Sequence, residues 1–127
     1  MQSPFFRSAS PKFVNRSQIL SLARTMAARI AAKHPEVDRV ILFGSFARGD
    51  FTAHSDIDLV IVLRSSSLPI RERIAEFLKD CTAYPTDVFP LTERELQVRI
   101  GEGDPFWTRA IREGIECYPG AEITAFD

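Results

Sequence analysis

Two short runs of apolar and β-branched residues, separated by a polar segment, restrict this chain to folds that contain a β-sheet. The runs are residues 37–43 (VDRVILF) and 57–63 (IDLVIVL). Short runs of this composition are typical of strands. The second run is continuously apolar after Asp58, so we predict a central strand that is buried on both faces. Because consecutive strands usually lie side by side, we expect the two to be neighbours.

Helical periodicity surrounds the two predicted strands. Apolar residues recur every three or four positions between residues 19 and 31, after a predicted N-cap at Ser17. This order of elements predicts an α/β (α+β) fold in which a small mixed β-sheet is flanked by helices. The other predicted elements are a helical turn at 46–49, helices that begin near Pro69, Thr92 (with a capping box to Glu95) and Asp104, a strand at 84–89 closed by Pro90, and a short edge strand at 115–118.

Length and composition indicate one soluble domain. The 127 residues suffice for a single core, and we expect a flexible lead (1–15), a domain (16–120) and a tail (121–127). The net charge of −1 and the absence of a long apolar run predict no direct nucleic-acid binding and no membrane span. We expect a cytoplasmic protein with two reduced cysteines and no zinc site. The acid-free, basic stretch 1–35 is loosely typical of a transit peptide, but a basic-faced helix is the favoured interpretation.

The segment between the first two strands begins and ends with residues that carry chemistry. Gly44-Ser45 follows the first strand, and ten residues later comes Asp56-Ile57-Asp58. Residues two apart in a strand point to the same face, so Asp56 and Asp58 place two carboxylates side by side. A divalent cation relieves their repulsion, and Mg²⁺ prefers carboxylate oxygens. For an isolated Asp-x-Asp, the alternative is a strand end that simply faces water.

Gly44, Ser45 and Asp87 extend this candidate site. Gly44 has no Cβ and lets the backbone approach a ligand, while Ser45 offers a hydroxyl and an amide. Asp87 lies in the third predicted strand, next to apolar residues. If that strand lies beside the second, Asp87 joins Asp56 and Asp58; a solvent-facing aspartate on an edge strand is the alternative. The set predicts phosphoryl-type transfer with two metal ions, with Asp87 as a candidate general base.

The same residues resemble the signature of the DNA-polymerase-β-like nucleotidyltransferase superfamily, and more narrowly of the minimal nucleotidyltransferases. The matching stretches are FGSFARGD (43–50) and SDIDL (55–59), against a family pattern of GSxARG followed by SDxDL. The resemblance implies the nucleotidyltransferase fold, two Mg²⁺ ions as cofactors and ATP or another nucleoside triphosphate as substrate. It implies triphosphate contacts by Gly44, Ser45 and Arg48, metal binding by Asp56 and Asp58, and a ligand or base at Asp87.

Two nearby side chains have simpler explanations. Arg48 forms either a phosphate contact or a surface ion pair with Asp50. His54 lies in the same segment, and an exposed histidine without a catalytic role is the favoured interpretation. Trp107 is expected in the core, although a helix surface with Phe106, or the apolar lead with Phe5, Phe6 and Phe13, would also serve as a docking surface.

The resemblance also implies a protein partner. Minimal nucleotidyltransferases often act as antitoxins beside a helical HEPN toxin, which is an RNase, and some transfer AMP to a tyrosine of the toxin. We therefore expect Mg²⁺-dependent transfer of AMP from ATP to a hydroxyl on a HEPN-type toxin. Two alternatives stay open, namely a non-catalytic module that masks the toxin and a small-molecule transferase of the aminoglycoside-modifying type. Assembly as a homo- or hetero-oligomer also stays open.

Overall fold

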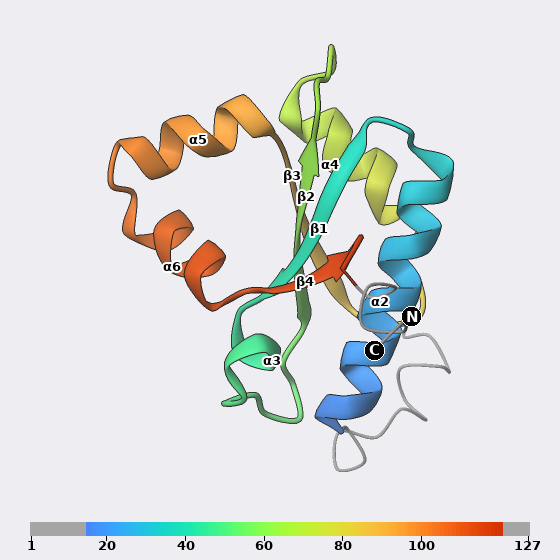
Figure 1. Ribbon diagram of the computed structural model, residues 1–127. Coiled ribbons are helices and arrows are strands. Elements are labelled where there is room, and N and C mark those ends of the chain that lie inside the picture. The colour runs from blue at the N-terminus through green and yellow to red at the C-terminus, as the bar shows by residue number, and fades with distance from the viewer. Residues whose placement is uncertain (1–14, 121–127) are drawn as a thin grey trace.

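One mixed sheet of four strands, with helices on both faces, forms the centre of the computed structural model, which describes residues 15–120 (Figure 1). Across the sheet the strand order is β3-β2-β1-β4. β1 pairs antiparallel with β2 and β4, and β2 pairs parallel with β3, so the predicted mixed sheet is confirmed. In chain order the elements are α2 (Arg16–Lys33), β1 (Val37–Phe43), α3 (Ser45–Arg48), β2 (Ile57–Leu63), α4 (Ile70–Leu78), β3 (Thr86–Thr92), α5 (Glu93–Gly101), α6 (Pro105–Glu113) and β4 (Ile115–Tyr118).

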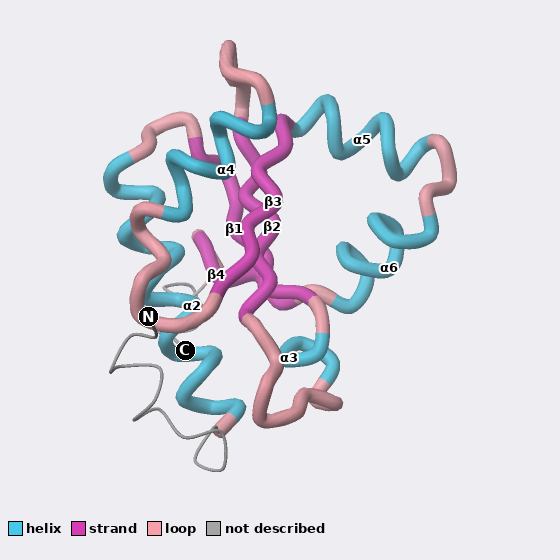
Figure 2. Tube along the Cα trace, turned by 180° about the vertical axis from the view of Figure 1, so that it is seen from behind, coloured by secondary structure: helices cyan, strands magenta, loops and turns pink. Residues whose placement is uncertain are grey.

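Each face of the sheet packs into its own hydrophobic core. α2 and α4 cover one face and α5 and α6 cover the other, as the ribbon in Figure 1 and the reverse view in Figure 2 show. Along β2, Ile57 and Leu59 belong to the core under α2 and α4, whereas Val60 and Val62 belong to the core under α5 and α6. β2 is therefore central and buried on both faces, as predicted. By the same alternation, Asp58 lies on the face covered by α5 and α6.

Local sequence signals produce most of the predicted boundaries. The strands at 37–43 and 57–63 have the predicted limits. Thr92 Oγ1 accepts from the Glu95 amide at 3.1 Å, and the Glu95 carboxylate accepts from the Thr92 amide at 2.9 Å, which is the predicted capping box at the start of α5. Asp104 caps α6 by accepting from the amide two residues later at 2.9 Å.

Two predicted details are wrong. The first helix is capped by Asn15, not Ser17, because the Asn15 side chain accepts from the Gln18 amide at 3.1 Å. The third strand starts later than predicted and continues through Pro90 instead of ending there. Within the described residues β3 pairs with β2 alone, and an edge strand tolerates a residue that has no amide hydrogen to donate.

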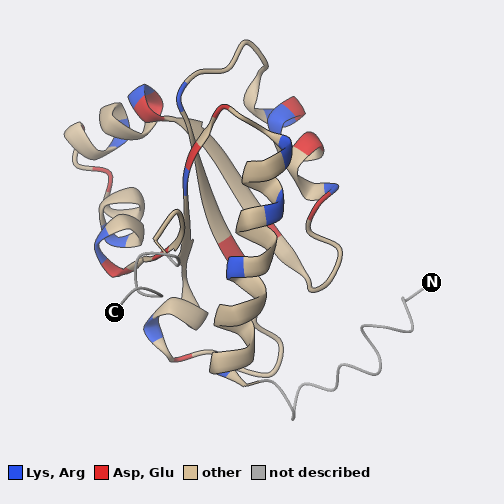
Figure 3. Ribbon diagram, turned by 45° about the vertical axis from the view of Figure 1, so that its right-hand side comes forward, with Lys and Arg blue, Asp and Glu red and all other residues tan. Residues whose placement is uncertain are grey.

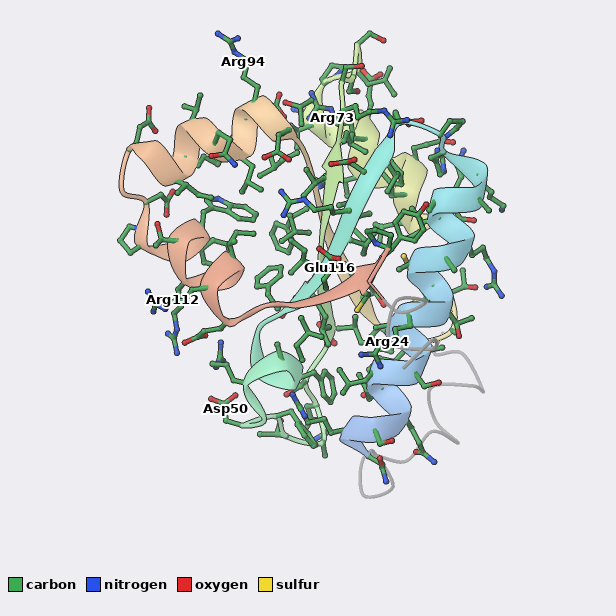
Figure 4. All side chains as sticks on the ribbon, viewed as in Figure 1. Arg24, Asp50, Arg73, Arg94, Arg112 and Glu116 are labelled. Atoms are coloured by element: carbon green, nitrogen blue, oxygen red, sulfur yellow. The ribbon has the colours of Figure 1, made fainter. Side chains whose placement is uncertain are left out.

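Arg73 is a buried charged residue that the sequence pattern does not reveal. It extends from α4 (Figure 4) and forms a two-point ion pair with Glu95 of α5, with Nη1–Oε1 at 2.7 Å and Nη2–Oε2 at 3.1 Å. Its guanidinium also donates to the carbonyls of Leu68 and Pro90. These bonds tie the start of α5 to α4 across the end of β3.

Some predictions fall on residues 1–14 and 121–127, which lie outside the described residues. These are the lead and the tail, including Phe5, Phe6 and Phe13, so the domain limits stay a prediction. α2 is a packed helix that carries Lys and Arg (Figure 3), in line with the predicted basic-faced helix. Both cysteines are buried and free. Between residues 15 and 120, no helix is long and apolar enough to span a membrane.

Candidate active site

Three aspartates gather where β2 and β3 begin, on the face covered by α5 and α6. In the parallel register of these strands, Asp58 pairs with Asp87, and on its other side Asp58 pairs with Phe43 of β1. Asp56 lies one residue before β2 and projects to the same side as Asp58. Asp58 is half-buried, whereas Asp56 and Asp87 are exposed. Asp87 is thus both a residue of an edge strand and a neighbour of the Asp-x-Asp pair.

The negative charge of the carboxylates at this position is only partly compensated. Burial, followed by the negative charges of Asp87 and Asp56, raises the pKa of Asp58 to about 6, against a smaller lowering by Arg48. Burial and the charge of Asp87 also raise the pKa of Asp56. No hydrogen bond from residues 15–120 offsets either shift. Such a cluster favours either protonation or the arrival of a cation.

Gly44 is required by the close approach of β1 to Asp58. Its backbone has φ +79° and ψ −156°, a conformation that is essentially restricted to glycine. A Cβ at this position would collide with the Asp58 carboxylate. The predicted glycine-serine turn therefore faces the predicted acids, as the neighbouring positions of β1 and β2 require.

A pocket of about 540 Å³ extends from this turn to α6, a volume in the range of small-molecule sites. Its lining comes from two parts of the chain, the glycine-serine turn with its neighbours and Asp58, and α6. Asp56 and Asp87 do not line the pocket and adjoin it through Asp58. The lining residues are Phe43, Gly44, Ser45, Arg48, Asp58, Pro105, Phe106, Arg109, Ala110 and Glu113.

Two arginines supply positive charge to the pocket. Arg48 forms the surface ion pair with Asp50, with Nε–Oδ2 at 3.2 Å, and also lines the pocket. Arg109 Nε lies 3.1 Å from both carboxylate oxygens of Glu113, and Arg48 Nη1 lies 3.9 Å from the same group. Exposed ion pairs of this kind are weak, so a phosphate can replace Glu113 as their partner.

The donor set fits Mg²⁺. The three carboxylates offer hard oxygen ligands, and the raised pKa of Asp58 marks negative charge that a cation would neutralise. Among residues 15–120, no three His, Cys, Asp or Glu side chains stand close enough to form a complete metal cluster. Mg²⁺ is commonly held by one or two carboxylates and completes its shell with water and substrate phosphates. The arrangement therefore suits a cation that is bound together with a phosphate.

Two features of the site are not predicted from the sequence, namely the part of the pocket wall formed by α6 and the contact of Arg16 with α3. The local sequence pattern does not indicate that residues 105–113 pack near Gly44. Arg16, at the start of α2, donates from Nε to the carbonyl of Phe46 at 2.8 Å and from Nη2 to the carbonyl of Ala47 at 2.9 Å. It thereby fixes the position of the short helix α3. The only sequence feature that pointed to this contact was the basic character of residues 16–33.

His54 and Trp107 have the positions that we favoured from the sequence, an exposed segment and the hydrophobic core. His54 is exposed and does not line the pocket. Trp107 is buried in the core under α5 and α6, while Phe106 beside it is exposed. Arg94 and Arg112 point away from the sheet on the outer sides of α5 and α6 (Figure 4), so neither adds charge to the pocket.

Comparisons with known proteins agree with this geometry. A family model described as "Nucleotidyltransferase domain" matches residues 24–116. "Putative protein adenylyltransferase MJ0141" of Methanocaldococcus jannaschii is 39% identical over 49 residues, which cover 39% of this chain and 48% of the relative. "Putative protein adenylyltransferase MJ0604" of the same organism is 62% identical over 26 residues, which cover 20% of this chain and 26% of the relative. The chain thus spans about half the length of the first relative and about a quarter of the second.

A solved structure has the same fold. The crystal structure of a "putative nucleotidyltransferase" from Sulfolobus solfataricus superimposes with a TM-score of 0.58 over 76% of this chain and 82% of that chain. The two sequences are 23% identical, so the likeness concerns the fold alone. The predicted fold class is confirmed.

Proposed function

This chain belongs to the nucleotidyltransferase domain family, and from that premise we propose that it transfers AMP from ATP, with Mg²⁺, to a hydroxyl group on a partner protein. One observation carries the proposal. Gly44 packs against Asp58, which is also the register partner of Asp87, so a phosphate-binding turn and a group of acids share one end of the sheet. Phosphoryl-type transfer needs this combination, because catalysis rests on positioning and charge neutralisation.

Each residue has a defined role in the proposed reaction. Gly44, Ser45 and Arg48 bind the triphosphate. Asp56 and Asp58 would hold Mg²⁺ together with the phosphates, and the cation's contribution would be to neutralise charge on the triphosphate and on the leaving pyrophosphate.

The proposed reaction exchanges one phosphorus–oxygen bond for another. The acceptor hydroxyl oxygen forms a bond to the α-phosphorus while the bond from the α-phosphorus to the bridging oxygen of pyrophosphate breaks. Asp87 is the group that we assign to take the hydroxyl proton, because it is exposed beside Asp58 and reachable from solvent. The products are the AMP-modified acceptor and pyrophosphate.

The acceptor we propose is a tyrosine of a HEPN-type toxin, which would make this chain an antitoxin. Two observations support a protein acceptor. The names of both archaeal relatives describe protein adenylyltransferases. Asp87 lies on an edge strand and is exposed, so the surface of a folded protein has access to it.

A label-transfer assay tests the proposal. The chain is incubated with Mg²⁺, a purified HEPN-type protein and ATP labelled at either the α- or the γ-phosphate. We expect the α label on the partner and the γ label in pyrophosphate. Asp56→Asn and Asp58→Asn should each lower the transfer rate by at least about 100-fold, because each removes a charge that acts on the phosphates. Asp38→Asn, an exposed aspartate of β1, is the matched control.

The outcomes separate the competing functions. No transfer of the α label by the wild-type protein would contradict the proposal. If the wild type transfers no label and the partner binds the Asp56→Ala, Asp58→Ala double variant as tightly as it binds the wild type, masking of the toxin is the function. Label on an added aminoglycoside instead of the protein would identify a small-molecule transferase.

A further inference from the structure

Phe106 is an exposed aromatic residue in the wall of the nucleotide pocket. It is the second residue of α6 and lines the pocket together with the glycine-serine turn. Its side chain is 51% exposed, although the adjacent Trp107 is buried. Small-molecule sites are typically lined by apolar and aromatic side chains, so an exposed ring in a pocket wall is a candidate ligand contact.

Three aromatic rings pack beside Phe106 without stacking on it in parallel. Phe43 meets it at 5.8 Å between centroids with an interplanar angle of 90°, and Trp107 meets it at 5.0 Å and 87°. Phe89 is farther away, at 6.3 Å and 52°. None of these three rings stacks face to face on Phe106. The ring is therefore held among its neighbours while about half of its surface, 51%, stays exposed and available to a ligand.

The two parts of the pocket lining differ in chemistry. Gly44, Ser45 and Asp58 form the part where the triphosphate is proposed to bind. On α6, Pro105, Phe106 and Ala110 contribute apolar surface, and the ion-paired Arg109 and Glu113 contribute charge. A nucleoside triphosphate has the same polarity, with charged phosphates at one end and an aromatic base at the other.

We propose that the face of Phe106 is the stacking platform for the base of the nucleoside triphosphate. This inference rests on the proposed function, because the phosphates must lie at the Gly44 end for the base to reach α6. Stacking accepts any base, since every base has an aromatic face. ATP and GTP should therefore both use Phe106.

A binding experiment with two probes tests the platform. The Kd of Mg²⁺–ATP and of Mg²⁺–tripolyphosphate, which lacks base and ribose, is measured by calorimetry for the wild type and for variants at Phe106. Phe106→Leu retains apolar volume without the ring, and Phe106→Ala removes both. We expect both variants to weaken ATP binding by roughly 5- to 100-fold and to leave tripolyphosphate binding unchanged. Phe106→Tyr, which keeps the ring face, should bind ATP like the wild type.

Two controls make the result specific. Val98→Ala removes a comparably exposed apolar group (49% exposed) from α5, outside the pocket, and should leave both affinities unchanged. Trp107 is the single tryptophan and touches Phe106, so its fluorescence should respond to ATP more than to tripolyphosphate.

Several results would overturn the inference. Unchanged ATP binding in Phe106→Leu and Phe106→Ala would place the base elsewhere. An equal loss for both probes would make Phe106 a structural residue. Loss of partner binding with normal ATP affinity would make it a docking residue. If the wild type bound neither probe, the proposed function would fail and the platform with it, whereas failure of the platform alone leaves tripolyphosphate binding intact.

Discussion

Replacing Asp58 by asparagine should abolish transfer and yet stabilise the metal-free protein. The carboxylate is half-buried between Gly44 and Asp87, and its ionised form is disfavoured by burial and by its acidic neighbours. Asparagine has nearly the same shape and no charge. The variant therefore removes an unfavourable charge without opening a cavity.

The size of the effect follows from the pKa of Asp58. Its rise from 3.8 to about 6 corresponds to about 3 kcal/mol at 1.36 kcal/mol per unit. Because the side chain is only half-buried, solvent screening reduces this to about 1–2 kcal/mol. The sign follows from proton binding. The folded state holds the proton more tightly than the unfolded state, so the penalty is absent below pH 3.8, grows between pH 3.8 and 6, and is complete above pH 6.

Urea denaturation in EDTA at pH 7.5 and at pH 4.5 measures this difference. At pH 7.5, Asp58→Asn should be more stable than the wild type by about 1–2 kcal/mol, and at pH 4.5 the gap should shrink to less than half of that value. The control is Asp38→Asn, whose exposed side chain lies on β1 away from the acids; it should change stability by less than about 0.5 kcal/mol at either pH.

Two results would refute this reasoning. A destabilised Asp58→Asn protein at pH 7.5 would mean that the carboxylate makes favourable contacts in the folded state. A gain in stability that does not change between pH 7.5 and 4.5 would mean that its charge is not the cause.

Three further variants test other contacts of the site. Gly44→Ala should destabilise the fold by about 2–4 kcal/mol and remove activity, because its Cβ meets Asp58; Gly49→Ala, at φ +94° with open space around it, should cost about 1–2 kcal/mol and retain activity in the same melts and label assay. Arg16→Lys should raise the Kd for ATP several-fold and lower stability by about 1 kcal/mol, because an ammonium group does not reproduce the geometry of the two guanidinium hydrogen bonds to α3. An unchanged ATP affinity would show that this contact does not position the glycine-serine turn. Glu95→Gln should destabilise the protein by about 3 kcal/mol at pH 7 without changing ATP affinity, because it leaves the Arg73 guanidinium buried without its anion. Hydrogen bonding from Arg73 lowers the pKa of Glu95 to about 2, so this stabilisation is present above pH 4.5 and lost as the pH falls toward 2, which acid titration of the melts will follow.

The strands and the acids were predictable because short-range patterns determine them. The alternation and length of residues 37–43 and 57–63 set both strands, and adjacency of sequential strands was enough to bring Gly44 to Asp58. Asp87 required one more assumption, that the strand after α4 returns beside β2, and the parallel register bears it out.

The incorrect predictions arise where the tertiary structure around a residue outweighs that residue's intrinsic conformational preference. Pro90 ends a strand only where its missing amide hydrogen is needed, and β3 has no such need at that position because it pairs with β2 alone in the described residues. Ser17 and Asn15 are both good caps, and the backbone geometry decided between them. The contribution of α6 to the pocket depends on packing between residues far apart in the sequence, which no local pattern predicts.

The exposed position of Asp87 on an outer strand has a consequence for how such a protein changes during evolution. In the proposed function, ATP is bound by β1, α3 and α6, whereas the acceptor approaches along the margin of β3 that pairs with no strand among residues 15–120. Under that proposal, substitutions along this margin would alter which molecule is modified without disturbing the glycine-serine turn. Acceptor choice and nucleotide chemistry are then inherited as separable properties of one small domain.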